Sequence, residues 1–75
     1  MKVKELIDEK KVIKTLNDMF HYWCYEFGEI NINPNCGNTF VTDELKFIYE
    51  FCSNHNLKME IYYNDYINDL ECRIY

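Results

Sequence analysis

Hydrophobic residues recur at helical spacing from Val12 to Phe27, in the stretch VIKTLNDMFHYWCYEF. At about 100° per residue, the apolar positions share an arc of roughly 140°. They are Val12, Ile13, Leu16, Met19, Phe20, Trp23, Cys24 and Phe27. The other side is polar, so the pattern predicts one amphipathic helix over residues 12–27 that buries one face. Gly28 follows directly and suits the left-handed residue that closes a helix.

The segments on either side of this helix follow a different period. Val3, Leu6 and Ile7 predict a helical turn or two at the start of the chain, with a break near residues 8–10. Glu29 to Asn33 alternate polar and apolar residues and predict a short strand. Pro34 to Asn38 carry the strongest turn signal in the sequence, because Pro presets φ while Gly and Asn accept positive φ. Residues 39–41 then return as a second short strand.

A second helix is predicted to begin at Thr42, where the residue type fits an N-cap. Asp43 and Glu44 follow in the first turn, where carboxylates favour the helix dipole. Its end is predicted at residues 53–56, SNHN. The predicted inner face consists of Val41, Leu45, Ile48, Tyr49 and Cys52, widened by Phe47 and Phe51.

The last nineteen residues alternate apolar and polar positions and predict a hairpin. A two-residue turn would set Glu60 against Asp69 and bring a polar Asn onto the apolar face. A four-residue loop, residues 65–68, instead pairs Ile61 with Cys72 and sets Glu60 against Arg73. We choose the longer loop, because it keeps one face of the hairpin apolar. It also places Glu60 opposite Arg73, which attracts it, and not opposite Asp69, which repels it.

Together these elements predict an α+β domain spanning residues 1–75. Two helices pack on one face of a small, mainly antiparallel sheet of three to four strands, in the order α-β(β)-α-β-β. The other face is left to solvent or to a partner. The order of the strands within the sheet does not follow from the sequence.

The distribution of charge along the chain indicates what such a domain binds. The net charge is −5, but residues 1–14 carry five Lys against three carboxylates, whereas residues 15–75 carry three cations against ten carboxylates. This acidic body repels phosphate backbones and attracts basic partners, so we expect no direct nucleic-acid binding. No signal-peptide pattern or membrane-length apolar run occurs, which favours a cytoplasmic protein without membrane contact.

The cysteines and histidines offer little chemistry. His21 and Cys24 on the first predicted helix mirror Cys52 and His55 on the second, and two crossing helices could bring them together around zinc. The tight loop between cysteines that is typical of structural zinc sites is missing. Cys36 lies on the predicted turn without a nearby His or Lys to activate it. We therefore expect no enzyme, no metal and no cofactor.

Tyrosines set among carboxylates are the remaining candidate for function. Tyrosine anchors interfaces because it buries a large area at small entropic cost and keeps a hydroxyl for hydrogen bonding. Among acids it suits a basic groove lined by Arg and Lys. The predicted partner-binding residues are Asp18, Tyr22, Tyr25, Glu26, Glu60, Tyr62, Asp65, Tyr66, Asp69 and Glu71.

In size, acidity and lack of catalytic apparatus, the chain is similar to the loose class of phage-encoded inhibitors of bacterial defence, including anti-CRISPR proteins. That likeness rests on general properties, so it assigns no role to any residue. It implies a regulator or inhibitor in the cytoplasm of a bacterial host cell, docked on a basic protein or nucleoprotein complex. We expect a monomer or a homodimer. Two alternatives stay open: a self-associating structural or oligomerisation module, and a small zinc-binding domain.

Overall fold

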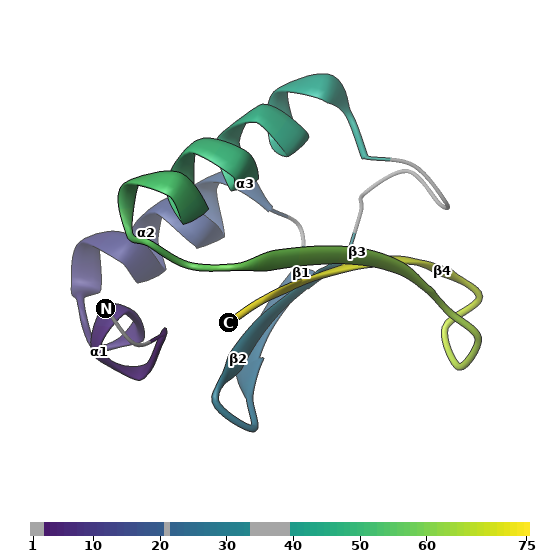
Figure 1. The fold of residues 1–75 in the computed structure, drawn as a ribbon, viewed down its shortest axis with the longest axis horizontal. Helices are drawn as coiled ribbons and strands as arrows, with labels where there is room; N and C mark the ends of the chain where they lie inside the picture. The colour runs from purple at the N-terminus through teal and green to yellow at the C-terminus, as the bar shows by residue number, and fades with distance from the viewer. Residues whose placement is uncertain (1–2, 21, 34–39) are drawn as a thin grey trace.

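The chain folds into helices on one side of an antiparallel sheet, in the order α-α-β-β-α-β-β (Figure 1). This is a computed structural model, and it describes residues 3–20, 22–33 and 40–75. The elements are α1 (Val3–Ile7), α2 (Lys10–Met19), β1 (Tyr22–Glu26), β2 (Glu29–Asn33), α3 (Thr42–Asn54), β3 (Met59–Asn64) and β4 (Asp69–Ile74). The predicted α+β class is confirmed, and so is the break between a short first helix and the next one.

The four strands form one sheet in the order β1-β2-β4-β3, so β1 and β3 are its edges. In the β2–β4 pairing, Ile30 lies opposite Ile74 and Ile32 lies opposite Cys72, and all four side chains are buried. Because successive side chains of a strand alternate between the two faces, the residues between them point to the other face. One face of the sheet therefore belongs to the core.

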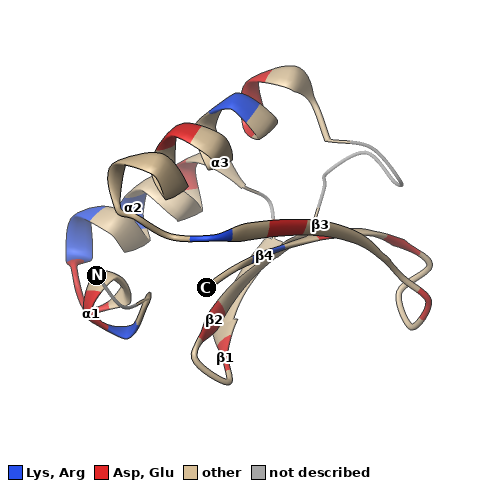
Figure 2. Ribbon diagram, viewed as in Figure 1, with Lys and Arg blue, Asp and Glu red and all other residues tan. Residues whose placement is uncertain are grey.

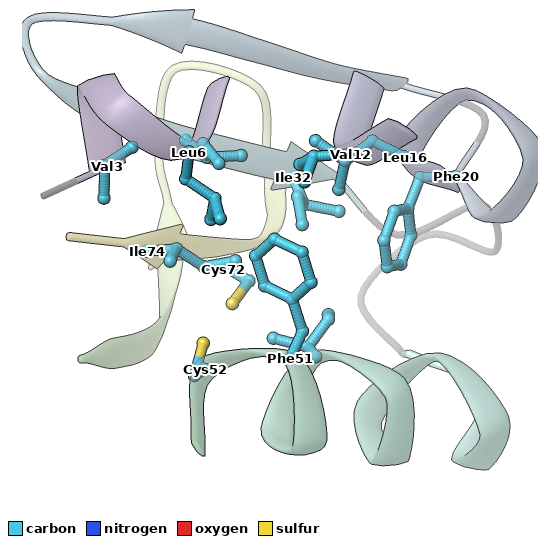
Figure 3. Close-up of a cluster of buried hydrophobic side chains, with 12 residues drawn as sticks. Val3, Leu6, Val12, Leu16, Phe20, Ile32, Phe51, Cys52, Cys72 and Ile74 are labelled. Atoms are coloured by element: carbon cyan, nitrogen blue, oxygen red, sulfur yellow. The ribbon is translucent and has the colours of Figure 1, made fainter. Parts of the chain in front are cut away.

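The core joins this face to side chains from all three helices (Figure 3). Figure 3 shows Phe51 and Cys52 of α3 pointing toward Leu6 of α1 and Cys72 of β4. The buried cluster consists of Val3, Leu6, Val12, Leu16, Phe20, Ile30, Ile32, Ile48, Phe51, Cys52, Cys72 and Ile74. Each large aliphatic side chain buried in this way stabilises the fold by about 1.5–3 kcal/mol.

The predicted single helix over residues 12–27 is wrong. The helix α2 ends at Met19, where the Phe20 N–H still donates to the Leu16 carbonyl at 2.9 Å and the backbone of Phe20 is already extended. The chain then forms β1, which contains Trp23 and two tyrosines, residue types that favour strands. Phe27, placed on the core side of the predicted helix, is 93% exposed.

A two-residue turn joins β1 to β2 and explains why a hairpin replaces the rest of the helix. Phe27 and Gly28 both have positive φ, 55° and 81°. Two consecutive residues of this kind are typical of the tight turn whose twist matches that of paired strands. The left-handed conformation predicted for Gly28 is therefore found, but it closes a hairpin and not a helix.

The second predicted helix is confirmed as α3, with two corrections. Its N-cap is Val41 and not Thr42, and the Glu44 carboxylate accepts the Val41 N–H at 3.4 Å. Val41 and Tyr49 were expected inside and are 46% and 68% exposed, whereas Glu44 is buried. Phe40 and Val41 form no strand, and the predicted turn over residues 34–38, with Thr39, lies outside the described residues.

The register chosen for the C-terminal hairpin is confirmed in every pair. Met59 lies opposite Ile74, Ile61 opposite Cys72 and Tyr63 opposite Leu70. The loop between β3 and β4 has the four predicted residues, 65–68. Glu60 lies opposite Arg73, and their side chains form an ion pair at 2.6 Å. Alternation and charge together therefore determine the register here.

Candidate functional site

The face of the sheet turned away from the core carries polar side chains from all four strands, and we call it the open face. Its residues are Tyr22, Cys24, Glu26, Glu29, Asn31, Asn33, Glu60, Tyr62, Asn64, Asp69, Glu71 and Arg73. Figure 2 shows acidic positions on each strand of the sheet. Four glutamates, one aspartate and one arginine give the open face a formal charge of −4.

Strand alternation and register place these side chains in rows across the sheet. One row runs through all four strands, with Cys24 opposite Asn31, Asn31 opposite Arg73 and Arg73 opposite Glu60. Because residues on one face of a strand recur every second position, Tyr22 and Glu26 of β1 flank Cys24 on the same face. Residues that are far apart in the sequence thus share one surface.

Arg73 is a cation in the middle of the open face and lies between two glutamates. Its Nη2 lies 2.6 Å from Glu60 Oε2, and its Nε lies 3.4 Å from Glu29 Oε2. Its guanidinium carbon lies 4.9 Å from the centre of the Tyr75 ring. The hydrogen bond to Glu60 raises the pKa of Arg73. This arginine therefore partly neutralises two of the five carboxylates.

The other two glutamates leave the open face acidic. Among the described residues, no Lys or Arg forms an ion pair with Glu26 or Glu71. Glu71 accepts a hydrogen bond from the Tyr62 hydroxyl. That hydrogen bond, with some burial, raises the pKa of Tyr62 to about 12. The Tyr62 ring is thus held at a fixed position beside the Glu71 carboxylate.

Tyr22 provides a second aromatic ring on the open face, at the β1 edge, and it is 54% exposed. Cys24 raises the pKa of the Tyr22 hydroxyl through its charge and a side-chain hydrogen bond, and burial, Glu71 and Glu26 add to the rise.

The described thiols are not activated. Burial raises the pKa of Cys24 and raises those of Cys52 and Cys72 to about 11 and 12. A nucleophilic cysteine needs the opposite change, because only the thiolate reacts. Cys36, the exposed thiol of the sequence prediction, lies outside the described residues.

The structure separates the residues considered for zinc. Cys24 lies on the open face, whereas Cys52 is buried in the core on the other side of the sheet. The His55 ring packs against Phe51, with centroids 5.0 Å apart. His21 lies outside the described residues, and the ranges 3–20, 22–33 and 40–75 contain no group of three metal-binding side chains. The crossing of two helices that this alternative required does not occur, because Cys24 is on a strand.

Six of the ten predicted partner-binding residues meet on the open face: Tyr22, Glu26, Glu60, Tyr62, Asp69 and Glu71. The sequence pattern correctly placed Tyr62 with Glu60 and Glu71 on one face of the hairpin. It placed Tyr22 and Glu26 on a helix, yet the strand that replaces this helix also brings them to one face. The open face therefore unites two groups that were predicted separately.

The other four predicted residues lie elsewhere. Asp18 is on α2, paired with Lys14 at 2.8 Å, and Tyr25 points to the opposite side of β1, where it lines a cavity of about 490 Å³. Asp65 and Tyr66 lie in the β3–β4 loop, where Tyr66 is fully exposed.

Sequence reasoning missed Glu29 and Asn31 of β2 and the central place of Arg73. Glu29 and Asn31 were assigned to a strand, but their neighbours in the sheet depend on strand order. The usable signal for β1 was the run from Tyr22 to Tyr25, which is rich in aromatic residues and is followed by a turn. Read as a strand, it would have placed Tyr22, Cys24 and Glu26 on one face.

Comparison of the chain with protein-family models, with curated proteins and with solved structures gave no match. In the part of the chain that the structure describes, no helix has both the length and the apolar character to cross a bilayer. The case for function therefore rests on the chemistry of the open face.

Proposed function

We propose that this chain is a small non-enzymatic protein that docks through its open face on a basic surface of another protein and blocks or regulates it. The observation that carries the proposal is the gathering of Tyr22, Glu26, Tyr62 and Glu71 on one exposed side of the sheet, with an excess of negative charge. The partner we propose is a nucleic-acid-binding protein or nucleoprotein complex.

The chemistry of the open face supports a basic partner. Carboxylates attract Lys and Arg over long range and speed the encounter. An arginine of the partner can stack on the ring of Tyr62 or Tyr22 while a nearby glutamate accepts hydrogen bonds from the N–H groups of its guanidinium. Glu71 lies beside Tyr62, which is the arrangement that such an arginine needs.

The fixed backbone of the sheet favours binding. The paired strands lose little backbone freedom on binding, because the register already holds the main chain in place. A groove that holds nucleic acid presents several cations in a row, and the open face offers carboxylates from four adjacent strands. We place this action in the cytoplasm of a bacterial host, in line with the likeness to inhibitors of bacterial defence.

The proposal is tested with a fluorescein-labelled nona-arginine peptide, whose binding is followed by fluorescence anisotropy. The variant Glu26→Gln/Glu71→Gln removes two negative charges from the open face, and the amide oxygen introduced at position 71 still accepts a hydrogen bond from Tyr62. The matched control, Asp43→Asn/Glu50→Gln, removes the same charge from exposed positions of α3. We expect the first variant to bind about tenfold more weakly and the control to change affinity less than about twofold.

Measuring the same binding at several salt concentrations gives a second test. Binding that depends on the open face weakens as ionic strength rises, because the Debye length shortens from about 10 Å at 0.1 M to about 3 Å at 1 M. Equal weakening by the two double variants would reject the open face as the docking site. An affinity that does not change with salt would reject electrostatic docking altogether.

A further inference from the structure

The edge strand β3 directs unpaired backbone groups away from the sheet, and those groups belong to its apolar residues. Lys58 and Tyr75 exchange both of their backbone hydrogen bonds, at 2.8 and 3.0 Å. In an antiparallel pair such positions alternate, so every second residue counted from Lys58 bonds to β4. The N–H and C=O groups of the residues between them point outward from the edge: Met59, Ile61 and Tyr63.

The side chains along this edge are apolar and exposed. Ile61 is 41% exposed and Tyr63 is 48% exposed, although both lie on the core side of the sheet. Met59 packs against the core, whereas Ile61 lies outside the buried cluster. A six-residue edge strand with outward backbone groups and exposed apolar side chains is a template for another strand.

We propose that β3 pairs with β3 of a second copy of this chain, antiparallel about a two-fold axis at Ile61. Ile61 then lies opposite Ile61 of the second copy, and Met59 lies opposite Tyr63. On the open face, Glu60 lies opposite Tyr62 of the second copy. Two four-stranded sheets become one continuous sheet of eight strands.

Other registers are less favourable for definite reasons. Shifts by one residue place outward backbone groups against inward ones, so no ladder forms. A shift by two residues in one direction sets Glu60 directly against Glu60 of the second copy, which brings like charges together. The same shift in the other direction sets Met59 against Asp65 of the loop. Only the register centred on Ile61 pairs the strand along its length without such a conflict.

The opposite edge of the sheet offers a matched control. Strand β1 is shorter, and Trp23 Nε1–H donates to Asn17 Oδ1 of α2 at 2.8 Å, which ties this edge to a helix. Tyr25 of β1 is 38% exposed, close to the value for Ile61. A lysine at either position adds the same charge at similar exposure, but only Ile61 lies on the proposed axis.

The experiment is sedimentation equilibrium of the full chain over about 10 µM to about 1 mM, a range suited to a small interface. We expect the mass of the unchanged chain to rise toward twice 9.2 kDa. Ile61→Lys and Ile61→Glu should each stay monomeric, because each puts identical charges opposite one another. An equimolar mixture of the two should regain the dimer, and Tyr25→Lys should dimerise like the unchanged chain.

Three results would overturn the proposal. A constant monomer mass of the unchanged chain over the whole range would show that β3 does not pair. A mixture of the Lys and Glu variants that stays monomeric, while the unchanged chain dimerises, would show that Ile61 does not face Ile61 of the second copy. Loss of the dimer in Tyr25→Lys would assign it to the β1 edge. Since none of these readings uses a basic ligand, they are independent of the docking experiment.

Discussion

Arg73 is the residue whose removal tests the electrostatics of the open face most simply. The variant Arg73→Met keeps an unbranched side chain in the sheet but removes the charge. It loses the ion pair with Glu60 at 2.6 Å, the weaker one with Glu29 at 3.4 Å, and the contact with the Tyr75 ring. All three interactions are partly exposed, so each contributes about 0.5 kcal/mol. The expected loss of unfolding free energy is about 1.5 kcal/mol on the same scale.

Thermal unfolding followed by circular dichroism measures this loss. For a domain of this size, about 1 kcal/mol corresponds to about 4–8 °C, so Arg73→Met should lower the Tm by roughly 6–12 °C at low salt. At about 1 M NaCl the difference should shrink, because exposed ion pairs are screened. The control, Lys14→Met, breaks an ion pair with Asp18 whose side chains are 78% and 62% exposed, and should lower the Tm far less.

A double-mutant cycle assigns the loss to the proposed contact. Glu60→Gln should cost about 0.5 kcal/mol more in the unchanged chain than in Arg73→Met, because the ion pair is present only in the former. The reasoning fails if Arg73→Met lowers the Tm no more than Lys14→Met, or if the two open-face substitutions are additive within error.

Four further substitutions test the fold and the open face. Ile48→Ala should cost about 2–5 kcal/mol in urea unfolding because Ile48 is fully buried, whereas Tyr49→Ala should cost less than about 0.5 kcal/mol; equal costs would contradict the orientation of α3. Phe27→Asn should stabilise the protein by about 0.5–1 kcal/mol, since Asn accepts the positive φ of 55° and the lost ring is exposed; a lower urea midpoint would refute this. Because the pKa of Tyr62 is raised to about 12, its protonated form is favoured in the folded state, so stability should fall as pH rises from about 10 to 12. Tyr62→Phe, which cannot donate to Glu71, should remove part of that fall, and an unchanged alkaline profile would contradict the hydrogen bond.

The C-terminal hairpin was predictable because local pattern and charge agree there. Alternation fixed the buried face of β3 and β4, and the choice between Asp69 and Arg73 as the neighbour of Glu60 fixed the register. Both signals act between residues close in the sequence, so no knowledge of the remaining fold was needed. The open-face residues that β3 and β4 contribute could therefore be predicted from the sequence.

The first predicted helix failed because helical spacing and strand-favouring residue types coincide in the same stretch. Trp23, Cys24 and Phe27 fall on the apolar arc set by Leu16, yet the stretch from Tyr22 to Tyr25 is also rich in the aromatic residues that favour strands. Positive φ at Phe27, an unusual residue for a tight turn, concealed the hairpin. The prediction relied on the helical period alone, without weighing the strand preference of aromatic residues.

The orientation of α3 depended on tertiary contacts that a single sequence does not reveal. Its buried side lies about 60° around the helix from the predicted one. Phe47 packs edge-on against Phe20, with ring centroids 5.7 Å apart, and Phe51 is buried beside it. Glu44 enters the buried side near the helix start, where its carboxylate accepts a backbone N–H. These contacts turn Tyr49 out to solvent.

The central claim is that basic partners bind the open face, and amide chemical-shift mapping with the nona-arginine peptide tests it most directly. In the ¹⁵N-labelled chain, the account predicts the largest shift changes at the amides of the four strands, centred on Glu71 and Arg73, with α3 little affected. The largest changes at the exposed acids of α3, around Glu50, would contradict it.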